Sequence, residues 1–269
     1  MNKAPTVVKL GGEVISGAGL AALCTDLAAL ARTRPLVMVH GGGKLASDVQ
    51  RALGQTPRIV HGRRVTDDAA LEVIKMTVAG VMNVNLCAAL TAAGASPVGL
   101  HGASSQAIRA TRQPPAHTAD GLLDYGHVGE VVGMNTALLT CLLQAKFLPV
   151  LSCLGCDEHG AVYNINADAV ANQLALHFRA QTLVLISDVP GILRDLHDPS
   201  SRISELNAEH ARAAIKDGTI SGGMIPKVEE SLAALEAGLA EVHVLGRLTP
   251  GDLERSLREP GFVGTVIRQ

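Results

Sequence analysis

Two glycine-rich segments, each following a short aliphatic run, contain lysines that could neutralise an anion. The first is VVKLGG, in which Lys9 lies within the run and precedes Gly11 and Gly12. The second is VHGGGK, in which glycines 41–43 lead to Lys44. A lysine in an aliphatic strand is costly to bury unless an anion faces it, and glycine lets a ligand approach the backbone closely. The pattern favours a phosphoryl or carboxylate site over a lysine that extends to solvent at a sheet edge.

Two common nucleotide motifs do not fit these segments. A Walker A loop continues from Gly-Lys to a magnesium-binding hydroxyl, and Leu45 occupies that position. The segment GAGLAA at 17–22 matches the dinucleotide fingerprint, but it begins six residues after the strand expected to end at Gly11. His40 stands where the ribose-binding acid should be. A dinucleotide oxidoreductase is therefore not expected.

Two polar segments add candidates for binding an acidic substrate. In GRRVTDD, Arg64 is a candidate clamp for a carboxylate, and Thr66 is the expected N-cap of the helix that follows. In NINADAVAN, the amide of Asn164 could bind polar groups of a substrate, and Asp168 begins a helix. Each has a simpler interpretation as a surface arginine, a turn residue or an acid that the helix dipole favours.

Two loops in the last third of the chain suggest phosphate contacts. SDVPGIL leaves a predicted strand at Asp188 and turns at Gly191. GTISGGMIPK leads into a helix whose first turn contains Lys227. The helix dipole disfavours a cation in a first turn, so a lysine beside two glycines indicates an anionic partner.

Alternation of strands and helices predicts an α/β fold with a mainly parallel sheet. Aliphatic runs end near residues 11, 40, 101, 153, 188 and 246, and helical periodicity covers 20–32, 45–53, 67–93, 135–145, 168–178, 208–216 and 228–238. Such sheets are covered on both faces and bind ligands at the carboxyl ends of their strands. Residues 108–132 break the alternation and predict a hairpin excursion. A soft boundary near residue 180 predicts two lobes, 1–180 and 181–269, on one sheet.

Composition excludes several other classes. A net charge of −2 provides no field for nucleic acid or an anionic membrane, so neither is an expected partner. Five cysteines without a signal peptide favour reduced thiols in the cytoplasm, and Cys153 and Cys156 are expected to be ordinary buried thiols. The longest apolar helical stretch is taken to be 20–31, which is too short to span a membrane. No metal-ligand set is apparent.

Seven motifs in order between residues 7 and 265 resemble the acetylglutamate kinase group of the amino acid kinase family. They are VVKLGGEV, VHGGGK, GRRVTD, GHVGEV, NINADAVA, LISDVPGIL and GGMIPKVEESLAAL. The resemblance implies a three-layer α/β/α sandwich, with an N-terminal lobe for the acyl amino acid and a C-terminal lobe for ATP. It implies transfer of a phosphoryl group from ATP, with Mg²⁺ on the phosphates, to the γ-carboxylate of N-acetyl-L-glutamate in arginine synthesis.

The resemblance also implies residue roles. Lys9 and Lys227 would neutralise the transferring group, and Asp168 would orient them. The expected substrate-binding residues are Gly42, Gly43, Arg64 and Asn164. The expected nucleotide-binding residues are Gly11, Gly12, Asp188, Gly191, Ile192, Leu193, Gly222, Gly223 and Met224. Arg63 stands where the family often has an apolar residue, which leaves open which arginine clamps the carboxylate.

Alternatives within and outside the kinases remain. An acyl-aminoadipate kinase of lysine synthesis shares the scaffold, and a catalytically inactive nucleotide-binding regulator would retain the fold. The first strand is expected to begin at about Thr6, which leaves no room for the extra N-terminal helix that the resemblance links to arginine inhibition. A cytoplasmic homodimer that L-arginine does not inhibit is therefore expected.

Overall fold

One central sheet organises the chain. The computed structural model describes residues 4–60, 62–118, 121–195, 198–220 and 224–269. The strands of the central sheet are β1 (Thr6–Leu10), β2 (Leu36–His40), β5 (Pro97–Leu100), β10 (Leu148–Ser152), β13 (Thr182–Ser187), β14 (Glu205–Asn207), β15 (Glu241–Gly246) and β16 (Thr265–Arg268). Their order is β14-β16-β15-β13-β1-β2-β10-β5. All neighbours pair in parallel except β15 and β16, so the predicted mainly parallel sheet is confirmed.

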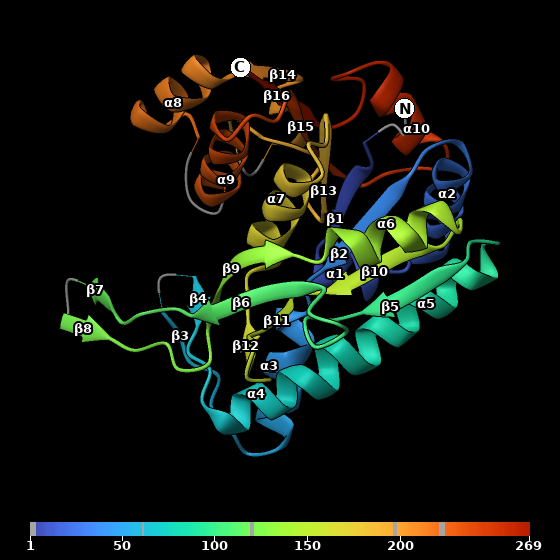
Figure 1. Cartoon of the computed structure of the whole chain (residues 1–269). Coiled ribbons are helices and arrows are strands. Elements are labelled where there is room, and N and C mark those ends of the chain that lie inside the picture. The colour runs from blue at the N-terminus through green and yellow to red at the C-terminus, as the bar shows by residue number, and fades with distance from the viewer. Residues whose placement is uncertain (1–3, 61, 119–120, 196–197, 221–223) are drawn as a thin grey trace.

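Helices cover both faces of this sheet (Figure 1). They are α1 (Gly12–Ile15), α2 (Leu20–Thr33), α3 (Gly43–Ala52), α4 (Asp68–Ile74), the π-helical segment η1 (Lys75–Met82), α5 (Asn83–Ala92), α6 (Thr136–Gln144), α7 (Ala167–His177), the 3₁₀ turn η2 (Pro199–Ser201), α8 (Ala208–Lys216), α9 (Met224–Glu236) and α10 (Asp252–Arg258).

The core has two parts because side chains alternate across each strand. One face of the sheet packs against α7 and α9, and the other packs against α2, α5 and α10. Val7 and Val8, neighbours in β1, belong to opposite parts and are both fully buried. The short aliphatic runs of the sequence are therefore strands buried on both faces, and the predicted three-layer α/β/α sandwich is confirmed.

The segment expected to leave the sheet does so. The strands β6 (Ile108–Arg112), β9 (Gly129–Met134), β11 (Leu154–Cys156) and β12 (Val162–Asn164) form a second sheet, and β7 (Ala116–Thr118) pairs with β8 (Gly121–Leu123) in a hairpin. Figure 1 shows this hairpin projecting from the body of the molecule. A second small hairpin joins β3 (Ile59–Val60) to β4 (Arg63–Arg64).

The helix Asp68–Ala92 corrects one expectation. Together α4, η1 and α5 form a helix of 25 residues that contains an 18-residue window with a mean hydropathy of 1.6, so it is long and apolar enough to cross a membrane. The stretch 20–31 is therefore not the longest apolar helical stretch. Leu86 and Leu90 of this helix are fully buried against the central sheet. Core helices pass the same length and composition test, so the helix is weak support for a membrane span.

One local expectation is wrong, and two elements near the carboxyl end were not predicted. The N-cap of α4 is Asp67, whose carboxylate accepts a hydrogen bond from Ala70 N. The expected N-cap, Thr66, lies one residue before this position, and its side chain is buried. The antiparallel strand β16 and the helix α10 at the carboxyl end were not expected from the sequence. Residues 1–3 lie outside the described residues, so the expectation about the N-terminal helix and arginine stays an expectation.

Candidate active site

Three adjacent strand ends meet in the middle of the central sheet. In β1, Leu10 pairs with His40 of β2 on one side and with Ile186 of β13 on the other. Gly11 N donates to Ile186 O at 2.9 Å, and Gly41 N donates to Leu10 O at 3.1 Å. The glycines that follow β1 therefore lie beside the glycines that follow β2. A crevice at the carboxyl ends of central parallel strands is where α/β proteins bind ligands.

The two glycine segments pack against each other. A Cβ added to Gly12 would lie 3.0 Å from Cα of Gly42, and a Cβ on Gly42 would lie 2.4 Å from Sδ of Met82 and 3.0 Å from Val78. Gly42 thus also allows η1 to approach the strand ends closely. Gly12 and Gly43 begin α1 and α3, which places the first N–H groups of two helices at this edge.

A buried histidine supports the second glycine segment. His40 is fully buried, and burial lowers its pKa, so the ring is neutral. Its Nδ1 lies 3.0 Å from Gly41 O and its Nε2 lies 3.0 Å from Nδ2 of Asn83. Gly41 O can only accept a hydrogen bond, and the side-chain nitrogen Nδ2 of Asn83 can only donate one. The geometry therefore assigns the proton of His40 to Nδ1. Asn83 also donates to Val150 O, so the turn after β2 is tied to β10.

The three predicted catalytic residues lie together. Lys9 Nζ, from β1, lies 2.8 Å from Oδ1 of Asp168 in the first turn of α7, and their side chains are only 14% and 21% exposed. Lys227, in the first turn of α9, donates from Nζ to Oγ of Ser187 at 3.1 Å. We refer to Lys9, Asp168, Lys227 and Ser187 as the lysine site. Their roles in catalysis stay predictions.

The pKa of Lys227 depends on burial and on neighbouring charges that include Lys9 and Asp168. Its pKa is lowered mainly by burial; Lys9 lowers the pKa further, whereas Asp188 and Asp168 raise it. Asp168 is paired with Lys9, whereas Lys227 forms no ion pair among the described residues, which leaves a half-buried ammonium group without a direct anionic partner. Such a group favours an anionic ligand, because an anion relieves the repulsion and the desolvation together.

A third carboxylate, Glu230 of α9, was not predicted from the sequence. Its Oε1 accepts from Nδ2 of Asn166 at 3.0 Å, and Asn166 is the N-cap of α7. Burial, and after it the negative charge of Asp168, raises the pKa of Glu230 to about 7, while Lys9, the Asn166 hydrogen bond and Arg63 lower it. The only sequence signal was an acid one helical turn after Lys227.

Arg64 is held against the first turns of α3. Its guanidinium donates to Gly43 O at 2.8 Å, to Ser47 Oγ at 2.6 Å and to Gln50 Oε1. All three partners are neutral, and among the described residues no carboxylate forms an ion pair with Arg64. Burial lowers the pKa of this side chain. A half-buried, pre-oriented guanidinium of this kind suits a carboxylate ligand.

Asn164 is oriented by a residue first taken for a helix cap. Its Nδ2 donates to Oγ1 of Thr66 at 3.1 Å, and Thr66 Oγ1 donates to Arg64 O at 3.1 Å. Thr66 therefore connects Asn164 of β12 to the β4 strand that carries Arg64. The structure brings these predicted substrate residues to neighbouring positions, and their contact with substrate stays a prediction.

The predicted nucleotide-binding residues divide into exposed and buried ones. Asp188 is exposed just beyond β13. Gly191 has a φ of +144°, and a Cβ there would lie 2.8 Å from Oγ1 of Thr265, so glycine is required. Ile192 and Leu193 are buried, and Ile192 N already donates to Thr265 Oγ1 at 2.8 Å.

The remaining nucleotide-binding predictions fall on the glycine loop before α9. Gly222 and Gly223 lie outside the described residues. Met224 begins α9 and is 3% exposed, so its side chain belongs to the core.

Cys153 and Cys156 are free and buried, as expected. Burial raises the pKa of Cys153 to about 11, although Lys9 acts in the opposite direction. A thiol with so high a pKa is protonated and unreactive near neutral pH.

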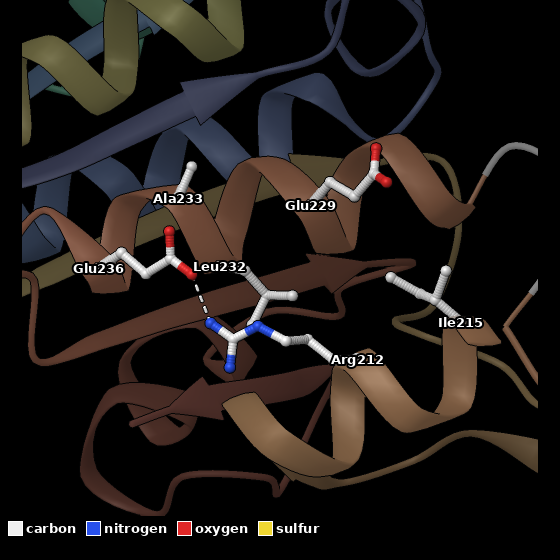
Figure 2. A pocket seen from close by; sticks show the side chains of 6 residues that line it. All are labelled: Arg212, Ile215, Glu229, Leu232, Ala233 and Glu236. Atoms are coloured by element: carbon white, nitrogen blue, oxygen red, sulfur yellow. Dashed lines mark hydrogen bonds and ion pairs between the residues drawn. The ribbon is translucent and has the colours of Figure 1, made fainter.

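A hollow of about 290 Å³ lies away from the lysine site, between α8 and α9. Figure 2 shows its lining, with Arg212 of α8 reaching across to Glu236 of α9. Glu229 lies on this side of α9, whereas Lys227 and Glu230 lie about one turn apart on another side of the helix. The hollow therefore does not belong to the lysine site.

These observations describe a candidate site for two anionic ligands. It contains two lysines, two glycine segments with exposed helix N-termini and a separate guanidinium without a carboxylate partner in the described part of the chain. Positioning and charge neutralisation are the main demands of phosphoryl transfer.

The chain belongs to the amino acid kinase family, whose model matches residues 4–246. Its fold is also that of more distant kinases. The structure of a carbamate kinase from Giardia superposes with a TM-score of 0.71 over the whole of both chains at 13% identity.

Similar proteins within this family and similar solved structures have more specific names. The acetylglutamate kinase of Sorangium cellulosum is 52% identical over 98% of this chain and 94% of that protein. The acetylglutamate kinase of Methanocaldococcus jannaschii is 39% identical over 86% of this chain and 78% of that protein. An N-acetylglutamate synthase from Neisseria gonorrhoeae, solved with coenzyme A and N-acetyl-glutamate, superposes with a TM-score of 0.85 at 25% identity; the match covers this whole chain but 60% of that one.

Replacing either lysine of the site tests the predicted catalytic role. Lys9→Ala and Lys227→Ala should each lower kcat by roughly 10²–10³-fold, as expected for loss of one preorganised charge donor. The KM values should change less, because the charges act mainly on the transition state. A coupled ADP-release assay measures both constants. Lys216→Ala, at the exposed end of α8, is the control; near-normal kcat in both site variants would contradict the two-lysine mechanism.

Replacing Arg64 tests the predicted carboxylate clamp. Arg64→Ala should raise the KM for the acyl amino acid roughly 10- to 100-fold, since a hydrogen bond to a charged group is worth about 1.5–3 kcal/mol. The kcat should change little, because the clamp holds ground and transition states equally. Arg64→Lys should rescue poorly, as it lacks the planar fork. If Arg63→Ala shows this phenotype and Arg64→Ala does not, Arg63 is the clamp.

Proposed function

We propose that the protein transfers the γ-phosphoryl group of ATP to the γ-carboxylate of N-acetyl-L-glutamate. The products are N-acetyl-L-glutamyl 5-phosphate and ADP, and the reaction belongs to arginine biosynthesis. The observation that carries the proposal is the 52% identity, over nearly the full length of both chains, to a protein named acetylglutamate kinase. The lysine site supplies chemistry that this reaction requires.

In the proposed reaction, the two lysines lower the repulsion between the reacting anions. A γ-carboxylate oxygen forms a bond to the γ-phosphorus as the bond to the β,γ-bridging oxygen breaks, and the electron pair leaves with ADP. The carboxylate is already ionised at neutral pH, so no general base is needed. Lys9, held by Asp168, and Lys227, held by Ser187, would place positive charge on the transferring group from two different elements.

The acceptor would lie over the glycines that follow β2. Arg64, already fixed against α3, would bind the α-carboxylate, and Asn164 would bind the neighbouring polar groups of the acyl amino acid. The N–H groups of Gly42 and Gly43, at the start of α3, would face a carboxylate or phosphoryl oxygen. These contacts would fix the γ-carboxylate close to Lys9 at the end of β1.

The nucleotide would lie over the carboxyl end of β13 and the start of α9. Asp188, the turn at Gly191, the glycine loop before α9 and the Gly11–Gly12 segment are the proposed contacts. Among the described residues no cluster of three or more His, Cys, Asp or Glu side chains could hold a metal ion. In the proposed reaction Mg²⁺ is held mainly by the phosphates of ATP, where it would neutralise part of their charge.

The proposed enzyme is a cytoplasmic homodimer with two lobes on one sheet. The proposed lobe boundary at residue 180 falls between α7 and β13, and the lysine site draws on both sides of it. Five free cysteines suit a reducing compartment. Met76, Val81 and Val84 are each more than half exposed on the helix Asp68–Ala92, and β5 is an edge strand of the central sheet. An apolar helix face beside an open edge suits a two-fold contact.

Substrate choice is the direct test of the proposed function. N-acetyl-L-glutamate with MgATP should give the acyl phosphate, trapped by hydroxylamine as the hydroxamate and accompanied by equimolar ADP. N-acetylaminoadipate and aspartate should react less well, because Arg64 and the glycines fix one distance between the two carboxylates. Glutamate should also react less well, because it has a charged amine in place of the acetylated nitrogen that Asn164 would face. Equal or better turnover of the aminoadipate derivative would favour the lysine pathway instead. No turnover of any acceptor, with nucleotide still bound, would favour the inactive regulator.

The subunit contact can be tested by placing charge on the exposed apolar face. Light scattering of the wild-type protein should give the mass of two chains. Val84→Glu combined with Met76→Glu should give one chain, because burial of unpaired carboxylates is unfavourable. Leu122→Glu is the matched control, since Leu122 is 66% exposed on the β8 strand of the projecting hairpin. A dimeric double variant, or a monomeric control, would show that the contact lies elsewhere.

A further inference from the structure

Glu230 joins α9 to α7 at two points. Its carboxylate accepts from the side-chain amide of Asn166 at 3.0 Å, and its main-chain carbonyl accepts from the side-chain amide of Asn172 at 3.3 Å. Within the described residues, the side-chain hydrogen bonds between these helices both end on Glu230. The helices come from the two proposed lobes, so these two hydrogen bonds add to the β1–β13 pairing and join the lobes beside the lysine site.

The Asn166 amide continues this connection to the catalytic candidates. While its Nδ2 donates to Glu230, its Oδ1 accepts from Asp168 N at 3.0 Å and so caps α7. Asp168 in turn pairs with Lys9 at 2.8 Å. An unbroken series of contacts therefore runs from Glu230 through Asn166 and Asp168 to Lys9.

Lys227, the other lysine of the site, lies on the same helix as Glu230. Lys227 precedes Glu230 by three residues on α9, so both side chains project from neighbouring turns toward the same region. Lys227 and Glu230 interact electrostatically, as do Glu230 and Lys9. Glu230 thus lies between the two elements that carry the lysines, close enough to interact with both side chains.

We propose that Glu230 is a positioning residue: through Asn166 it fixes the amino end of α7, with Asp168 and Lys9, against α9, with Lys227. The proposal rests on the proposed function, because it assigns Glu230 a part in aligning the two lysines on the transferring phosphoryl group. Glu230 serves this role through a side-chain oxygen that accepts from the Asn166 amide, and such an oxygen is present in the charged and in the neutral form of the group.

Kinetics of matched variants test this role. Glu230→Ala should lower kcat about 10- to 100-fold, the effect of a small misplacement of reacting groups. The KM values should change much less. Glu230→Gln keeps an acceptor oxygen for Asn166 and should restore most of the activity. Glu229→Ala, one residue away and facing the α8–α9 hollow (Figure 2), should behave like the wild type.

A double-variant cycle shows whether Glu230 acts through Asn166. In an Asn166→Ala background, Glu230→Ala should cost little further, since the contact is already lost. Effects that multiply would overturn the proposal, as would a Glu230→Ala enzyme with nearly normal kcat or a Glu230→Gln enzyme as impaired as Glu230→Ala.

Hydrogen exchange provides a second readout that needs no substrate. The amides at the start of α7, including Asp168 N, should exchange faster in Glu230→Ala and unchanged in Glu229→Ala. Unchanged exchange in Glu230→Ala would overturn the proposal. If the wild-type protein released no ADP with N-acetyl-L-glutamate, the proposed function would fail, and hydrogen exchange would still decide whether Glu230 fixes α7.

Discussion

The ion pair between Lys9 and Asp168 is the constraint on which the site depends. Lys9 projects from the central strand of a sheet that is buried on both faces, where an unpaired ammonium would be strongly unfavourable. Asp168 meets it because α7 begins at this edge, and α7 begins there because Asn166 caps it. Removing one partner of a buried pair costs about 3–5 kcal/mol. The position of Lys9 in β1 and the start of α7 therefore depend on each other, and together they determine the charge of the site.

Lys227 and Arg64 have a different kind of hydrogen-bond partner from Lys9. Lys227 has a hydroxyl as its hydrogen-bond partner, and Arg64 has a carbonyl, a hydroxyl and an amide. Neutral partners fix the direction of a cation without cancelling its charge. One cation is thus neutralised within the protein, while the other two keep their charge for a ligand.

The sequence predicted what local patterns determine. Aliphatic runs located six central strands, and glycines after two of them located the strand ends, because burial and close approach leave a mark on residue type. Glu230, Ser187 and Thr66 could not be found in this way. Each acts through a partner more than 35 residues away, at Asn166, Lys227 and Asn164, and such pairings depend on tertiary packing. The roles assigned to the site residues came from resemblance and still await experiment.

The π-helical segment η1 has two sides with different neighbours. Its inner side chains Val78 and Met82 lie so close to Gly42 that a methyl group there would collide with them, while Met76 and Val81 point outward and are more than half exposed. Protein interiors are close-packed and transmit displacement. A partner chain that pressed on the outer side would thereby move the backbone beneath the proposed acceptor position, so association and substrate affinity would be thermodynamically linked through this helical segment.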